Sequence, residues 1–140
     1  MRHQRSVIDY SLAKRATLAD LFAGRVSTLD VCDAHPYLLR AAKYHGETAA
    51  TDCPVCKREP LIHVTYVYGD ELKDAAGQVR ATIELPKLAR DYADLTVYVV
   101  EVCRTCGWNH LNTSFQIGTK GERPRRGRRA AADSQAGGTP

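Results

Sequence analysis

The stretch TVYVVEVCRTCGW, residues 96–108, joins a strand-like run to a pair of closely spaced cysteines. Its first half is rich in β-branched and aromatic residues, which favour strands. Cys103 and Cys106 follow at once, with only two residues between them. The stretch therefore predicts a strand that runs directly into a metal-binding turn, with a return strand after it.

A second pair, Cys53 and Cys56, lies upstream. A tetrahedral Zn²⁺ ion takes four ligands, and two short turns that each present two thiolates supply them. Residues 57–102 separate the pairs, a longer gap than the roughly 15–20 residues of the common pattern. The extra loop closure costs only about 0.8 kcal/mol, whereas a structural zinc contributes about 10–16 kcal/mol in finger peptides. The sequence therefore predicts one Zn²⁺ bound by Cys53, Cys56, Cys103 and Cys106.

Two other interpretations of the cysteine pairs are weaker. A thioredoxin-like dithiol is expected between a strand and a helix, whereas both pairs here are flanked by strand-like sequence. A catalytic zinc keeps three protein ligands and an open position, which four thiolates would close. The chain also has no His-Glu-x-x-His, Gly-x-Ser-x-Gly, phosphate-loop or dinucleotide motif. We therefore expect no enzymatic activity.

Two residues near the predicted site remain open. Cys32, the fifth cysteine, is a fifth ligand, a reactive thiol or a small core residue, and the last role is the commonest for a single cysteine. His110 follows Cys106 by four residues. It either replaces a cysteine ligand, hydrogen-bonds a metal-bound sulfur or lies on the strand surface opposite Leu111.

The fold is predicted from apolar periodicity. Helices are expected over residues 4–23 and 33–46, with a polar connector at 48–52. The first helix would bury a stripe made of Ile8, Leu12, Ala16, Ala19 and Phe22. Strands are expected over residues 61–68, 96–102 and 108–117, with a helical insertion over 69–95. Leu111, Phe115 and Ile117 would share one face of the last strand.

These elements predict an α+β fold. Its N-terminal helices would pack on a three-stranded antiparallel zinc-ribbon-like sheet with a helical insertion. We expect a single zinc-ribbon-containing domain over residues 1–118. Residues 119–140 are rich in Arg, Gly, Ser and Ala and poor in large apolar residues, which predicts a disordered Arg-rich tail.

The charge of the chain is concentrated in that tail. The formal net charge is +4, and the excess of basic residues lies after residue 118, so the rest of the chain is neutral. The sequence has no apolar run of about 20 residues and no apolar segment behind its charged N-terminus. We therefore expect a cytoplasmic protein without a membrane association, and a monomer.

These features favour a non-catalytic zinc-binding module that docks on a nucleic-acid-associated machine, in transcription or translation. The tail would bind nucleic acid without sequence preference by releasing counterions from phosphates. Tyr66, Tyr68 and Trp108 would either stack on bases or belong to the core. The alternative is a protein-interaction adaptor without nucleic-acid contact. A thiol redox sensor that uses the cysteine pairs is a third, weaker hypothesis.

Several segments together resemble one known family. They are DVCD at residues 30–33, PYLLRAAK at 36–43, YVYGDELK at 66–73 and VVEVC at 99–103. The family is one of small actinobacterial proteins catalogued as a domain of unknown function. The resemblance covers residues 1–118 and both cysteine pairs, and the Arg-rich tail lies outside it. It implies a zinc-ribbon-like protein and brings no activity with it.

Overall fold

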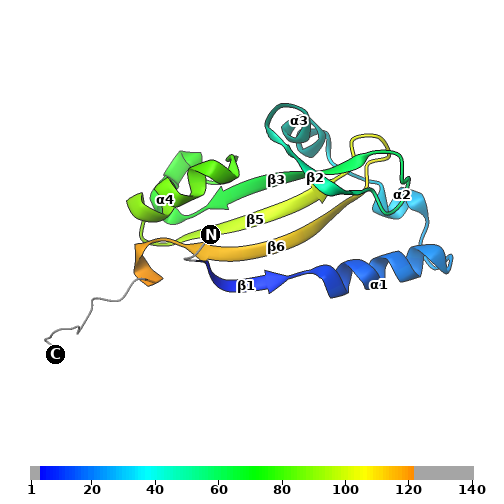
Figure 1. Cartoon of the computed structure of the whole chain (residues 1–140), viewed down its shortest axis with the longest axis horizontal. Helices are drawn as coiled ribbons and strands as arrows, with labels where there is room; N and C mark the ends of the chain where they lie inside the picture. Colours follow the sequence, from blue (N-terminus) through cyan, green and yellow to red (C-terminus); the bar gives the residue numbers. More distant parts are fainter. Residues whose placement is uncertain (1–3, 122–140) are drawn as a thin grey trace, which may run out of the picture.

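The computed structural model describes residues 4–121, and an antiparallel sheet runs along most of that length (Figure 1). The six strands are β1 (Arg5–Asp9), β2 (Glu47–Asp52), β3 (Pro60–Tyr68), β4 (Gln78–Val79), β5 (Leu95–Val102) and β6 (Asn109–Ile117). The helices are α1 (Ser11–Phe22), α2 (Thr28–Val31), α3 (Pro36–His45) and α4 (Leu85–Asp91). Short 3₁₀ turns span Asp70–Ala75, Thr82–Glu84 and Thr119–Gly121. The α+β class is thus confirmed.

The strands lie in the order β1-β6-β5-β3-β2, and β4 pairs with the remaining part of β3. The central strands β3, β5 and β6 agree closely with the three strands predicted from the sequence. The sheet has six strands rather than three, because three short strands extend its two edges. The expected three-stranded sheet therefore accounts for only the central strands of the observed sheet.

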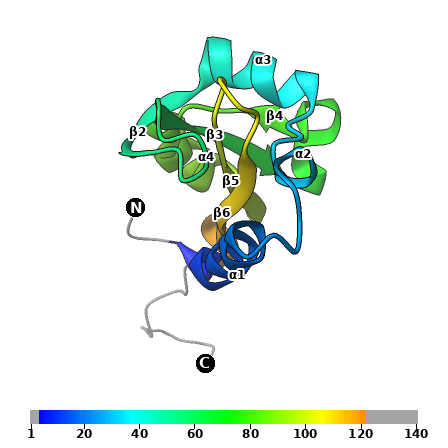
Figure 2. The same ribbon diagram turned by 90° about the vertical axis from the view of Figure 1, so that its right-hand side faces the viewer.

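One face of the sheet, which we call the front face, carries Val67, Val97 and Phe115 as cross-strand neighbours. Helix α4 covers one end of this face with Leu85 and Leu88, and together these side chains form the largest buried cluster. At the other end, α1 and α2 pack beside the cysteine-bearing loops. Figure 1 shows α1 and α4 at opposite ends of the molecule, and Figure 2, viewed from the α1 end, shows α1 beside β6.

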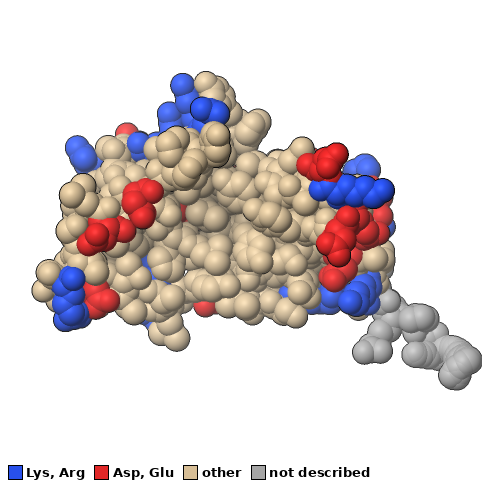
Figure 3. Space-filling model, turned by 180° about the vertical axis from the view of Figure 1, so that it is seen from behind, with Lys and Arg blue, Asp and Glu red and all other residues tan. Residues whose placement is uncertain are grey.

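Helix α3 lies on the opposite face, the back face. Ala41 and Ala42 are its buried residues, and they pack against Val64 and Val102. Small side chains let the helix approach the strands closely. Beyond α3, no helix of residues 4–121 covers the back face, and Figure 3 shows a broad surface there with few charged side chains.

The N-terminal segment differs from the expected long helix. Residues 5–9 form β1, which pairs with β6, and only then does α1 begin at Ser11. The Asp9 carboxylate accepts a hydrogen bond from the Ser11 backbone N–H at 2.8 Å, which satisfies a donor of the first helical turn. The expected apolar stripe is not buried, since Leu12 is 71% and Phe22 65% exposed. Residues 5–9 pair with β6 at the edge of the sheet, although the helical spacing of the apolar stripe begins within them.

Other local predictions also need correction. Residues 48–52, expected as a connector, belong to β2, which pairs with β3. The insertion over 69–95 contains one helix, α4, together with 3₁₀ turns and the short strand β4. In β6 the register shifts so that Thr113 pairs with Val99 but Leu111 pairs with Val100. This bulge places Leu111 on the back face, away from Phe115.

Candidate metal centre

The two Cys-x-x-Cys turns have the same local construction. In the first, the N–H of Lys57 donates to the Cys53 carbonyl at 3.1 Å, and in the second the N–H of Gly107 donates to the Cys103 carbonyl at 2.9 Å. Both of these residues have a positive φ, +59° for Lys57 and +91° for Gly107. The residue after each pair therefore adopts the left-handed conformation that closes the turn and points both sulfurs to the same side.

The four predicted ligands come together at one end of the sheet. The Sγ atoms of Cys53, Cys56, Cys103 and Cys106 all lie within 4.8 Å of one another. The Cys53 and Cys106 sulfurs are 3.7 Å apart, and those of Cys56 and Cys103 are 3.6 Å apart. A regular tetrahedron with metal–sulfur bonds of about 2.3 Å has edges of about 3.8 Å. The four cysteines can therefore hold one metal ion.

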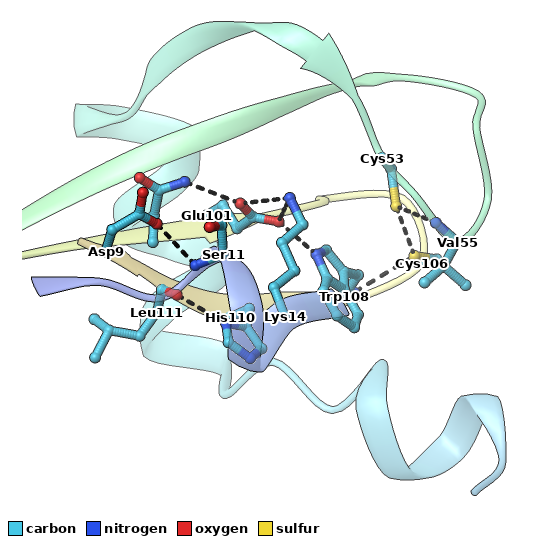
Figure 4. Close-up of polar contacts among 11 residues, drawn as sticks. Asp9, Ser11, Lys14, Cys53, Val55, Glu101, Cys106, Trp108, His110 and Leu111 are labelled. Atoms are coloured by element: carbon cyan, nitrogen blue, oxygen red, sulfur yellow. Dashed lines mark hydrogen bonds and ion pairs between the residues drawn. The ribbon is translucent and has the colours of Figure 1, made fainter. Parts of the chain in front are cut away.

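Backbone groups around the cluster are arranged to stabilise thiolates. The N–H of Val55 donates to Cys53 Sγ and the N–H of Trp108 donates to Cys106 Sγ, each at 3.4 Å (Figure 4). Burial nevertheless raises the pKa of Cys53 to about 12 and that of Cys106 to about 11. The backbone N–H of Arg58 lowers the pKa of Cys56 to about 7. A bound cation would have to displace the thiol protons, so metal affinity should rise with pH.

Cys32 lies beside this cluster rather than in a remote core. Its Sγ donates to Cys106 Sγ at 3.7 Å, and its side chain packs with Leu18 and Val31 against the buried cysteines. Burial raises the pKa of the Cys32 thiol, consistent with a neutral S–H donor. Sequence reasoning left the role of Cys32 open, because the segment after α2 and the second cysteine turn are far apart in the chain.

His110 is placed as a strand residue. Its ring stacks on Trp108 with centroids 5.8 Å apart, and its Nδ1–H donates to the Leu111 carbonyl at 2.7 Å. It is not among the residues whose ligand atoms converge within the described part of the chain. Of the roles left open for His110, the structure supports the strand surface opposite Leu111.

Sequence reasoning missed a buried carboxylate beside the site. Glu101, in β5, is 1% exposed and accepts hydrogen bonds from Lys14 Nζ at 2.9 Å and Trp108 Nε1 at 2.9 Å (Figure 4). Asn112, at the β6 bulge, donates to it at 3.2 Å. The available signal was a single charge within an otherwise apolar strand. The network connects α1 to the turn that carries Cys106.

Comparison with known proteins shows the family of this chain. A model of a family of unknown function, DUF5318, matches residues 1–131. The chain belongs to this family. It is 46% identical over 121 residues to uncharacterised proteins of Mycobacterium tuberculosis and Mycobacterium bovis, which covers 86% of this chain and 88% of each relative. The expected actinobacterial family of unknown function is thus confirmed.

The DUF5318 match also corrects the expected extent of the resemblance. It continues through the arginines of residues 123–129, which we had placed outside it. No solved structure matches the chain. Within residues 4–121, no helix is long and apolar enough to cross a membrane. The predicted disorder of the tail falls on residues outside those described, apart from Thr119–Gly121, which form a 3₁₀ turn.

Proposed function

We propose that this DUF5318 protein is a non-catalytic binding module stabilised by one structural Zn²⁺ ion. The observation that carries the proposal is the set of sulfur–sulfur distances of 3.6 and 3.7 Å among the four cysteines. Four thiolates in this geometry suit zinc or iron. They leave no open position for water or substrate, which is typical of structural sites.

The metal would stabilise the end of the sheet where the buried apolar cluster is small. Cys53 and Cys103 are buried with Leu61 and Trp108 in a small cluster at the end of the sheet. The ion would cross-link the loop before β3 to the turn between β5 and β6, two segments that are distant in sequence. Metal binding would therefore contribute directly to folding.

The first test is metal content. Native mass spectrometry of the full chain should find one zinc per molecule, and Cys103→Ser should lose the ion and lower the melting temperature sharply. Thr105→Ser is the matched control, since it changes the same turn without removing a sulfur. An unmodified chain that purifies with iron would reassign the metal. A Cys103→Ser chain with full zinc and normal melting would refute the site.

The proposed partner is a nucleic-acid-associated machine of transcription or translation, and two features support it. The back face has an open hollow of about 630 Å³, lined by Tyr66, Tyr68, Tyr98, Val100 and Leu111 among others. Its lining contains one charged residue, Asp70, and no cation. Such a surface suits a protein, because phosphate binding needs Lys or Arg. The arginines of residues 123–129 would supply that second contact.

The hollow alone also fits the alternative, a protein adaptor without nucleic-acid contact. Affinity capture from native cells, with and without nuclease, separates the two. The full chain, a chain lacking residues 122–140 and a Tyr68→Lys variant would be compared. Ribosome or polymerase components that depend on both the hollow and the tail support the nucleoprotein hypothesis. Nuclease-resistant partners that depend on Tyr68 alone support the adaptor.

A redox sensor remains the third hypothesis. The backbone N–H and the side chain of Arg58 lie beside Cys56 and help to lower the pKa of that thiol. Burial, however, raises the pKa of Cys53 and Cys106. Four thiolates would also leave no open position at the metal. We therefore expect zinc to stay bound under mild peroxide. Rapid and reversible zinc release at low peroxide would favour the sensor instead.

A further inference from the structure

The segment that carries Cys32 is fastened to the second cysteine turn by contacts that do not involve its thiol. The Ala34 backbone N–H donates to the Gly107 carbonyl at 3.0 Å, and Asn109 Nδ2 donates to Asp33 Oδ1 at 3.0 Å. Gly107 also sits so close to Cys32 that an added Cβ would lie 2.9 Å from the Cys32 carbonyl oxygen. The position of Cys32 beside the site is therefore set by the backbone on both sides of it.

The distances single out one corner of the cluster. Cys32 Sγ lies 3.7 Å from Cys106 Sγ, the same distance that separates Cys106 from Cys53. Cys32 is not within 4.8 Å of all four sulfurs, so it stands outside the tetrahedron and next to the Cys106 corner. Cys106 is also one of the two partly exposed members of the set, together with Cys56.

We propose that Cys32 is a reserve ligand that replaces Cys106, an inference that rests on the metal site proposed above. The exchange needs no oxidant. The Cys32 S–H proton would move along the existing hydrogen bond to the Cys106 sulfur, so that Cys106 would become the neutral thiol and Cys32 the thiolate that would hold the metal. Ligand number, ligand type and net charge are the same before and after.

Such an exchange would protect the site at its more accessible side. Cys56 and Cys106 are the second cysteines of their turns, and both are partly exposed. Within the described residues, Cys106 is the member of the set whose sulfur accepts a hydrogen bond from the Cys32 thiol. Loss or modification of Cys106 should therefore be tolerated, whereas loss of Cys56 should not.

The test compares full-length Cys106→Ser, Cys56→Ser, Cys32→Ser and the Cys32→Ser/Cys106→Ser double variant. Each is titrated with Co²⁺, whose absorption bands report the number of thiolate ligands, and with Zn²⁺ against a competing chelator. Cys106→Ser and Cys32→Ser should keep four-thiolate spectra and zinc affinities within about tenfold of the unmodified chain. Cys56→Ser and the double variant should drop to three thiolates and lose roughly 100-fold or more in affinity.

The outcomes separate this inference from the site itself. If Cys106→Ser binds as weakly as Cys56→Ser, or unfolds, Cys32 is not a reserve ligand. Equal affinities of Cys106→Ser and the double variant would overturn it in the same way. If the unmodified chain binds no metal with four thiolates, the proposed site fails first, and the inference falls with it.

Discussion

At the scale of single residues, Glu101 is the centre of a buried hydrogen-bonding network. Its carboxylate is buried, yet it lies 2.7 Å from Lys14 Nζ and also accepts from Trp108 and Asn112. Burial raises the pKa of Glu101, but these donors together outweigh it and hold the pKa below its usual 4.5. The ionised network therefore stabilises the fold above pH 4.5, and this contribution is lost as pH falls through the lowered pKa.

Removal of the cation should expose the cost of burying that carboxylate. We expect Lys14→Met to lower the free energy of unfolding by about 2–3 kcal/mol, because Glu101 would lose its only charged partner in the described structure. Chemical denaturation of the zinc-saturated chain at neutral pH measures this. The effect should be smaller than for a fully buried pair, since Lys14 is partly exposed.

Lys87→Met is the matched control for that experiment. Lys87 and Asp91 are also 2.7 Å apart, but both lie on the surface of α4. An exposed pair of this kind contributes about 0.3–0.5 kcal/mol. Equal effects of the two substitutions would show that the Glu101 network does not depend on its burial.

At the scale of elements, the two cysteine turns are built alike but differ at one position. The left-handed residue is Lys57 in the first turn and Gly107 in the second. A left-handed conformation costs a residue with a Cβ roughly 1–2 kcal/mol, which the first turn already bears. In the second turn a Cβ would also press on the Cys32 carbonyl, so only glycine fits there.

Gly107→Ala should therefore destabilise the protein by about 2–3 kcal/mol, from the strained φ and the crowded carbonyl together. Lys57→Ala should change stability by less than about 0.5 kcal/mol, because it keeps the same backbone conformation at an exposed position. Thermal unfolding of both variants with bound zinc provides the comparison. A Gly107→Ala chain as stable as Lys57→Ala would show that the second turn relaxes freely.

At the scale of the whole molecule, we assign folding to the parts of the sheet that helices cover and binding to an uncovered part of the back face. Helix α4 covers one end of the front face, α1 lies near its other end, and α3 covers one end of the back face, while α2 packs on the cysteine cluster. The rest of the back face presents the tyrosine hollow, in which Tyr68 is 45% exposed and meets Tyr98 edge to face. The proposed binding surface is thus a part of the back face that no helix of the described chain covers.

Deletion of residues 122–140 should separate binding from folding. We expect unchanged zinc content and a melting temperature within about 2 °C, since the segment is poor in large apolar residues. If the full chain binds nucleic acid non-specifically, the deletion should remove most of that affinity. Titrations at several salt concentrations should give the full chain a log–log slope of roughly −3 to −4, from five arginines.

Two results would contradict this expectation. Affinity that survives the deletion would move the nucleic-acid contact to the folded part of the chain. A large fall in melting temperature would show that the tail contributes to the fold. A chain of the same length with the five arginines changed to glutamine separates charge from length.

The sequence by itself determined the paired cysteines, the three central strands and helix α3. These features are encoded locally, in two-residue spacings, β-branched runs and a proline–glycine bounded helix. It also predicted that the two pairs would meet, because a tetrahedral ion needs four ligands, and their sulfurs do converge. Whether zinc is that ion stays a prediction.

Only the tertiary structure decided the remaining features. Residues 5–9 became a strand because the edge of β6 was available to pair with them. Leu111 lies on the other face from Phe115 because a bulge between them shifts the register of β6 by one residue, which reverses the facing of the side chains on one side of the bulge. Cys32 contacts Cys106, and Lys14 contacts Glu101, although the members of each pair are far apart in the sequence. Local propensity carries no information about such partners, so these contacts were fixed only when the sheet brought distant segments together.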